Sequence, residues 1–423
     1  MAGHFQEPGS FPSRSASASE LRRHWRILLA CMVGCALGVA TLPSYLLGPL
    51  APLLTRSLHW STTDILQSTS FLAAGVAMGA MIAGRLCDRH DPRKLAALSI
   101  ICLAALFVVA IFASAWSVWA FRAICLLMGL TAGGTSGVIY TRIISAHFVR
   151  ARGLALGITI SGAGITAFAA PLVVHAIGST YGWQAVFLAV TAVLLLFALP
   201  VVWLGTGDGD RPGASQAANP ASGGGLTLAQ AVRGVRFYLL LVPLVALGLI
   251  MGSVLVVTVP ALVSRGISPA RAAEIASLFG ISQVVARLGC GWVLDRVRPS
   301  IVAMAVFSLG AIGAYSFNGG GTAGAMLAVI FIGIVNGAEI DLVSFMTARF
   351  YGVAHYGSIF GAFFGSYMVI CIIGPLFGAQ LIALGGYAML FNCVAMLFLV
   401  AAGAMAMLLF VEGEAHPSAV ARH

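Results

Sequence analysis

Three charged residues fall inside segments that are otherwise apolar. Arg287 lies within the stretch 271–294, and Glu339 and Asp341 lie within "NGAEIDLVSF" (336–345). Arginine stays protonated, and its planar fork matches a carboxylate, so Arg287 suits a carboxylate ligand. Burial favours the protonated form of an acid and a nearby arginine favours the ionised form, so an acid beside Arg287 can exchange a proton when the arginine changes partner. The three residues predict anion recognition coupled to protons.

The two acids cannot share one cavity, because residues two apart on a helix point about 200° away from each other. We expect Glu339 to face Arg287 and Asp341 to lie nearer the loop arginines Arg296 and Arg349. Both acids are candidates for the proton-coupling group. The alternative for Arg287 is a structural ion pair with one of them.

The elements that hold these residues must be membrane spans. The chain has 423 residues, of which 60% are hydrophobic and 9% charged, whereas a soluble domain carries roughly 25% charged residues. Its mean hydropathy is +1.00. Apolar runs of roughly 20 residues recur, each long enough to cross about 30 Å of hydrocarbon. We expect an all-α polytopic membrane protein.

Charges, glycine pairs and prolines divide the apolar runs into twelve expected transmembrane helices. They lie near 27–54, 64–86, 95–115, 118–142, 152–176, 184–204, 237–262, 271–294, 300–318, 323–346, 357–384 and 387–411.

A segment rich in Gly, Ala, Ser and Pro separates the sixth span from the seventh, and it reads as a flexible linker. "GRLCDR" (84–89) recurs as "GWVLDR" (291–296), 207 residues later. A repeat near half the chain length is typical of transporters built from two parallel halves. The predicted divisions are a tail (1–26), a six-helix bundle (27–204), a linker (205–236), a second, pseudo-symmetric six-helix bundle (237–411) and a tail (412–423).

The basic residues orient the chain. With both termini inside, eighteen lysine and arginine residues fall on the inward side and three on the outward side, namely Arg56, Arg265 and Arg271. By the positive-inside rule we expect a multi-pass protein of the cell (inner) membrane with both termini in the cytoplasm. Arg122, near the outer end of the fourth span, is expected to extend its side chain to the outer surface.

The inward loop "GRLCDRHDPRK" (84–94) resembles a motif of the major facilitator superfamily. Together with the twelve spans and the second copy at 291–296, the resemblance covers the whole chain. It implies a cytoplasmic latch whose glycines allow close helix packing and whose charges break and reform contacts. The latch residues would be Gly84, Asp88, Arg89, Arg93, Gly291, Asp295 and Arg296.

Two further stretches, "HFVRARGLALGITISGAGI" (147–165) and "GAEIDLVSFMTARFYG" (337–352), are similar to the monocarboxylate transporters and the bacterial oxalate/formate carriers. The resemblance implies a carrier of small organic anions that works with protons or by exchange. Animal members have an Asp four residues before the eighth-span arginine and a Lys after a proline in the first span. This sequence has Gln283 and Ser44 at those positions, so the lactate mechanism does not transfer directly.

The resemblance also implies that spans one, four, seven and ten line a central cavity. The candidate substrate contacts are Arg287, Gln283, Thr41, Ser44, Tyr45, Tyr140, Thr258 and Asn336.

We find no nucleotide-binding loop, metal-ligand cluster, nucleophile triad or nucleic-acid motif in the sequence. We therefore expect a non-enzymatic carrier without cofactor or metal, which works as a monomer in the lipid bilayer on a small mono- or dicarboxylate and protons. The expected mode is proton-coupled uptake by alternating access. The alternative is an efflux carrier or antiporter for an aromatic or amphipathic compound or drug.

Overall fold

The computed structural model describes residues 14–38, 41–131, 139–140, 143–144, 147–148, 151–206, 226–294, 296–352 and 355–414, and within them every element is helical. The first group of helices is α1 (Arg14–Arg23), α2 (Trp25–Ala36), α3 (Leu42–Leu58), α4 (Thr62–Arg89), α5 (Pro92–Trp116), α6 (Val118–Leu130), α8 (Arg152–Tyr181), α9 (Trp183–Val193), the π-helix η2 (Leu194–Ala198) and α10 (Leu199–Gly205). The second group is α11 (Leu228–Ala231), α12 (Val235–Ser264), α13 (Pro269–Leu294), α14 (Pro299–Gly319), α15 (Gly321–Tyr351) and α16 (Tyr356–Glu414).

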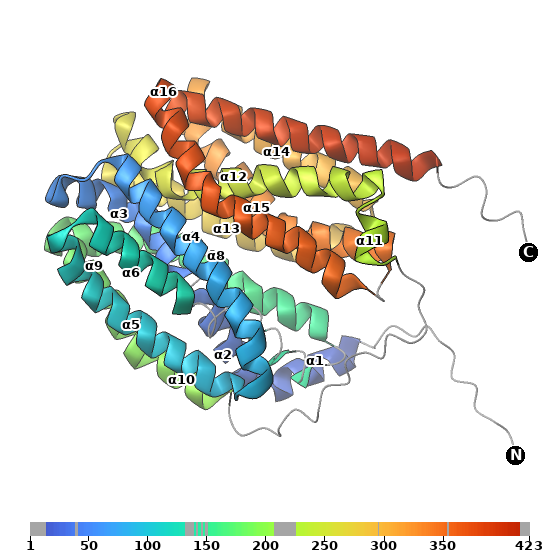
Figure 1. Ribbon diagram of the computed structural model, residues 1–423, viewed down its shortest axis with the longest axis horizontal. Helices are drawn as coiled ribbons and strands as arrows, with labels where there is room; N and C mark the ends of the chain where they lie inside the picture. The colour runs from blue at the N-terminus through green and yellow to red at the C-terminus, as the bar shows by residue number, and fades with distance from the viewer. Residues whose placement is uncertain are drawn as a thin grey trace, which may run out of the picture.

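Eight helical stretches of the described residues are long and apolar enough to cross a membrane, and two shorter apolar helices accompany them. The longest stretch, Ser358–Val411, has 54 residues and would span roughly 80 Å if it were straight. It is not straight, because the backbone leaves helical angles at Gly385 and Gly386, and Gly386 has a φ of 69°. The two arms of α16 therefore run back beside each other as two passes (Figure 1). The reversal falls where the sequence separates spans 357–384 and 387–411.

The first expected span, 27–54, is not one helix. α2 ends at Ala36 and α3 begins at Leu42, with Thr41 as the residue that precedes it. Pro43 lies in the first turn of α3, where its missing N–H costs nothing, whereas inside a continuous helix it would remove a hydrogen bond. The interruption at this proline is a correction to the single span. Pro49 and Pro52 lie inside α3 without ending it.

Short polar caps set where other helices start. Ser61 and Asp64 bond to each other's backbone N–H at 3.1 Å at the beginning of α4. Asp91 accepts from the Arg93 N–H at 2.9 Å before α5, which starts at Pro92. These side chains satisfy N–H groups that a helix start leaves unpaired.

Helices that precede residue 206 pack against helices that follow residue 226. The main pairings are α3 with α12, α8 with α13, and α4 with α16, and α4 also contacts α12. Glycines allow the α8–α13 approach: a Cβ on Gly280 would come within 2.3 Å of the Gly164 carbonyl oxygen. Close contact through small residues is the usual way for helices to associate in a bilayer.

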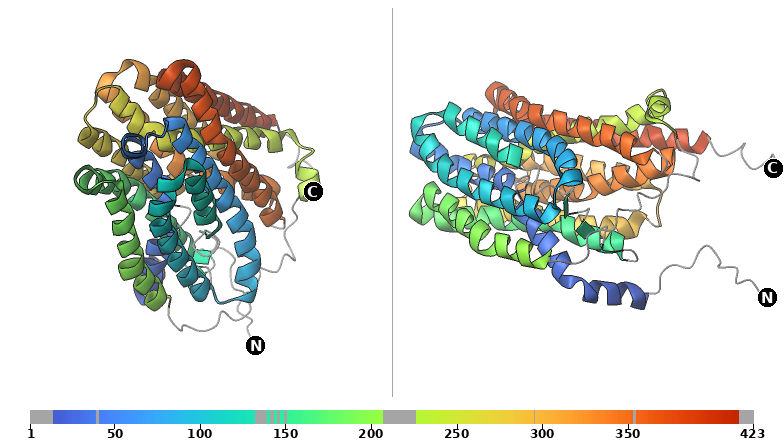
Figure 2. Two further views of the ribbon diagram at one scale, coloured as in Figure 1. Left: turned by 60° about the vertical axis from the view of Figure 1, so that its left-hand side comes forward. Right: turned by 60° about the horizontal axis from the view of Figure 1, so that its bottom comes forward.

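Large apolar side chains remain exposed around the outside of the molecule. Trp116, Leu196 and Phe410 are 86%, 79% and 76% exposed. An exposed apolar surface of this kind is stable when it faces lipid. α1 and the last described turn of α16 lie at the same end of the bundle, here called the termini end (Figures 1 and 2). The opposite end carries the α3–α4, α12–α13 and α14–α15 connections and is called the outer end.

Candidate functional site

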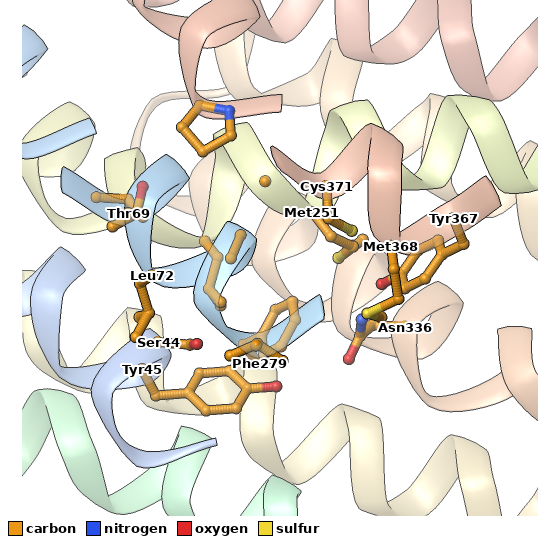
Figure 3. Close-up of a pocket in the computed structure, with 16 residues that line it drawn as sticks. Ser44, Tyr45, Thr69, Leu72, Met251, Phe279, Asn336, Tyr367, Met368 and Cys371 are labelled. Atoms are coloured by element: carbon orange, nitrogen blue, oxygen red, sulfur yellow. The ribbon is translucent and has the colours of Figure 1, made fainter. Parts of the chain in front are cut away.

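A cavity of about 220 Å³, here called the central cavity, lies where the two groups of helices meet. α3 and α4 contribute to one side of it, and α12, α13, α15 and α16 complete the wall. Figure 3 shows Ser44 and Tyr45 across the cavity from Tyr367, Met368 and Asn336. The lining residues are Ser44, Tyr45, Thr69, Leu72, Ala73, Val76, Met251, Gly252, Leu255, Val256, Phe279, Asn336, Tyr367, Met368, Cys371 and Pro375.

The lining is apolar and aromatic, with a few polar groups. Tyr45, Phe279 and Tyr367 supply rings, and Ser44, Thr69 and Asn336 supply neutral hydrogen-bonding groups. No Asp, Glu, Lys, Arg or His is among these lining residues. Ligand sites of this type hold the body of a small molecule by apolar contact and orient it with a small number of polar groups.

The charged residues lie beyond the cavity wall towards the termini end, Glu339 about one helical turn from Asn336 and Arg287 about two turns from Phe279. On α13, Gln283 accepts a hydrogen bond from the Tyr45 hydroxyl at 3.2 Å, and Arg287 follows one turn later. On α15, Asn336 lines the cavity and Glu339 follows three residues later. Residues three or four apart share a helix face. Arg287 and Glu339 therefore both lie on the termini-end side of the cavity, and together they are here called the charged layer.

Arg287 is 6% exposed, and its Nε and Nη1 atoms have no hydrogen-bond partner among the described residues. No ion pair within 4 Å joins it to Glu339 or Asp341, although its charge acts on both acids and on Tyr45. The structural ion pair considered from the sequence is therefore not formed. A buried guanidinium without a carboxylate costs several kcal/mol on the scales used for membrane insertion, so this position favours a negatively charged ligand.

Glu339 is 3% exposed and faces α16 as well as α13. The Tyr367 hydroxyl is hydrogen-bonded to its carboxylate, while Oε2 has no partner among the described residues. Tyr367 therefore connects the wall of the central cavity to Glu339. Asp341 is partly exposed and acts electrostatically on Arg287 and Cys290, so it faces α13.

Two of the polar residues expected from the first and tenth spans, besides Tyr45, line the cavity: Ser44 and Asn336. Three others, Thr41, Thr258 and Tyr140, are not among the residues that line this cavity. Thr41 donates to the Cys35 carbonyl at 2.9 Å, and Thr258 donates to the Val254 carbonyl at 2.7 Å, so both hydroxyls are used by the backbone. The Tyr140 ring is fully buried against Gly34, away from the cavity.

Gln283 and Arg287 are also absent from the lining, although the hydroxyl of the lining residue Tyr45 donates to Gln283. The sequence reasoning missed the contributions of α4 and of the first arm of α16, which supply Thr69, Tyr367 and Met368. The cluster "SYMVIC" (366–371) of polar, aromatic and sulfur-containing residues in an apolar run was the available signal.

Arg122 does not extend to the outer surface. It is 4% exposed, and its Nη2 donates to the Asp64 carboxylate at 2.8 Å and to the Gln67 side-chain oxygen at 2.6 Å. Its guanidinium lies 4.5 Å from the ring centroid of Trp119. The partner acid Asp64 sits in the first turn of α4, so Arg122 joins α6 to α4.

Only part of the expected latch falls within the described residues. Asp295 lies outside them, as do the surroundings of Gly84, Asp88, Arg89 and Gly291. The Arg93 guanidinium lies 4.2 Å from the Trp203 ring centroid, and Arg296 is exposed at the termini end.

Known proteins resemble this chain along most of its length. The 4-hydroxybenzoate transporter PcaK of Pseudomonas aeruginosa is 26% identical over 391 residues, which cover 81% of this chain and 85% of that protein. Crystal structures of the nucleoside transporter NupG and of the D-xylose-proton symporter superpose with TM-scores of 0.69 and 0.67, at 16% and 14% identity. They cover 91% and 90% of this chain and 98% and 97% of those chains.

At these identities the two structures show the fold alone, and that fold confirms the all-α polytopic architecture expected from the sequence. A family model described as Major Facilitator Superfamily matches residues 33–375. The chain therefore belongs to the major facilitator superfamily and is a transporter of that kind.

Proposed function

We propose that this protein is a secondary carrier of a small organic anion, and that the anion is a monocarboxylate with an aromatic body. In the proposed cycle the two six-helix bundles, 27–204 and 237–411, alternate access to the central cavity and carry the acid inward together with a proton. The observation that carries the proposal is Arg287, which is buried near a cavity whose lining residues carry no charge. Two of its guanidinium nitrogens have no partner among the residues that the structure describes.

The walls of the central cavity support the aromatic part of the proposal. Tyr45, Phe279 and Tyr367 can pack against a ring, and Met251 and Met368 adapt to its edges. The volume of about 220 Å³ is below the roughly 300–1,000 Å³ of drug-sized sites, which favours a single-ring compound. The name of the relative from Pseudomonas aeruginosa points to the same substrate class.

The charged layer below the cavity supports the coupling to protons. When the substrate carboxylate binds Arg287, it offsets the positive charge that acts on Glu339 and opposes its protonation. Glu339 then accepts a proton more readily, and substrate and proton occupy the carrier together. Tyr367 lines the cavity and is hydrogen-bonded to Glu339, so a substrate that contacts Tyr367 can change the surroundings of this acid.

Uptake of radiolabelled 4-hydroxybenzoate into vesicles that contain the purified protein tests the proposal. We expect saturable uptake that rises when the outside is more acidic than the inside. 4-Hydroxybenzamide, which keeps the ring but has no carboxylate, serves as the matched competitor and should not inhibit.

Equal inhibition by the amide would contradict recognition of the carboxylate, and uptake indifferent to the pH gradient would contradict the coupling. The uncharged aromatic lining also suits the alternative, export of an aromatic or amphipathic compound. If the label moves only outward while protons enter down their gradient, the result would favour export over uptake.

A further inference from the structure

A second cavity, of about 310 Å³, lies at the outer end between α3, α8, α12 and α13, and is here called the outer cavity. Like the central cavity, it is bounded by helices from both groups. Its lining residues are Pro49, Pro52, Leu53, Arg56, Pro171, Val174, His175, Ser179, Val259, Val263, Ser268, Pro269, Ala270 and Ala273.

The two cavities follow one another along the same helices. On α3 the central cavity is lined by Ser44 and Tyr45 and the outer cavity by residues from Pro49 to Arg56. The step from Tyr45 to Arg56 is eleven residues, or about 16 Å along the helix. Gly48 lies between the two sets and packs so tightly that a Cβ there would come within 2.7 Å of the Leu255 carbonyl oxygen. The close contact of α3 with α12 at Gly48 therefore lies between the residues of the two cavities along α3.

The outer cavity is positively charged, whereas the central cavity has no charged lining. Arg56 and His175 are the titratable residues of its lining, and no Asp or Glu is among them. Ser179 and Ser268 add hydroxyl groups, and four prolines with three valines form apolar walls. A guanidinium beside an apolar wall suits a ligand with a carboxylate at one end and an apolar body at the other.

Arg56 differs from Arg265 and Arg271, the other two arginines of the predicted outward loops. Arg271 is paired with Glu274 at 2.6 Å. Arg265 donates to the Phe317 carbonyl and to the Asn318 side chain. Asp64, the remaining acid near this end of the described chain, is paired with Arg122. Arg56 makes no hydrogen bond or ion pair with any residue that the structure describes, so its charge stays available to a ligand in the cavity.

We propose that the outer cavity is a second binding site for the transported monocarboxylate, which Arg56 holds by its carboxylate before the acid passes the Gly48 contact into the central cavity. This inference rests on the proposed function. The apolar prolines take the ring, and the two hydroxyls and the imidazole N–H complete the polar side. Capture at this site raises the local concentration of the anion on the outer side of the Gly48 contact, and it leaves the chemistry of the central cavity unchanged.

The concentration dependence of 4-hydroxybenzoate uptake tests the outer site. We expect Arg56→Gln to raise KM about tenfold at a nearly constant maximal rate, because the central cavity and the charged layer are intact. Arg56→Lys keeps the charge but loses the planar fork and should give an intermediate KM. Arg271→Gln removes the same charge at the same end but outside the cavity, and should leave KM unchanged.

Binding measured by calorimetry separates the two sites. With Arg287→Gln in the central region, we expect a weak residual affinity for 4-hydroxybenzoate that the double variant Arg56→Gln/Arg287→Gln loses. An unchanged KM in Arg56→Gln, or residual binding that survives in the double variant, would overturn the outer site alone. Absence of uptake by the unaltered protein would instead overturn the proposed function.

Discussion

Two arginines are buried inside the spans, and their surroundings are opposite. Arg122 has an acid, an amide oxygen and an aromatic face within contact distance. Arg287 is buried to the same degree, yet two of its nitrogens have no partner among the described residues. Removing one partner of a buried charge pair destabilises a fold, because the other charge is left uncompensated, whereas a buried charge that has no partner is already in that state. The difference marks Arg122 as part of the scaffold and Arg287 as part of the proposed site.

The largest expected effect on transport comes from Arg287→Gln. If Arg287 binds the substrate carboxylate, the change should reduce kcat/KM for 4-hydroxybenzoate uptake about 100-fold, since truncating one side of a buried charge pair costs about 2–5 kcal/mol. The melting temperature of the purified protein should stay equal or rise, because the change removes an unpaired buried charge. Retained carboxylate uptake in this variant would contradict the assignment of Arg287 to the substrate site and of Arg122 to the scaffold.

The next effect concerns the acid beside Arg287. In Glu339→Gln we expect exchange of substrate to continue while accumulation driven by a pH gradient is lost. One proton per acid can sustain about tenfold accumulation for each pH unit, and the variant should show none. Asp341→Asn is the matched control, and loss of accumulation in that variant instead would move the coupling role to Asp341.

A smaller effect is expected at the contact between the cavity wall and α13. Tyr45→Phe removes the hydrogen bond to Gln283 and leaves its amide oxygen unpaired. A cost of about 1 kcal/mol would raise KM roughly fivefold. Tyr238, which is exposed and outside both cavities, provides the control Tyr238→Phe. A KM equal to that of the control would show that Gln283 does not position the site.

The smallest effect on transport is expected from Arg122→Gln, which should act on stability instead. The Asp64 side chain is 33% exposed, so solvent recovers part of the lost interaction. We expect a loss on the order of 1–3 kcal/mol in unfolding free energy, seen as a lower melting temperature, with uptake per folded molecule changed less than about twofold. Recovery of the melting temperature in Asp64→Asn/Arg122→Gln would assign the loss to this pair.

Much of the architecture was predictable because the bilayer imposes it. The length of each apolar run and the Gly385–Gly386 reversal follow from local composition and spacing. The positions of Ser44, Tyr45 and Asn336 on the cavity wall were implied by the resemblance to the major facilitator superfamily. The break before Pro43 was not resolved, since one apolar run of 28 residues can hold either one helix or two.

The partners of the charged residues were not predictable from local patterns. Asp64 and Arg122 are 58 positions apart, and Tyr367 reaches Glu339 from a different helix. The outer cavity arises where four helices from both groups converge, and no single helix contains its outline.

The sequence by itself determined that this is a multi-span membrane protein with charges at Arg287, Glu339 and Arg56, because hydropathy and charge are properties of each segment alone. Only the tertiary structure decided which of those charges are satisfied. A helix fixes the direction of a side chain relative to its own axis, and the packing of other helices against that face determines whether it meets an acid, a ring or an empty cavity.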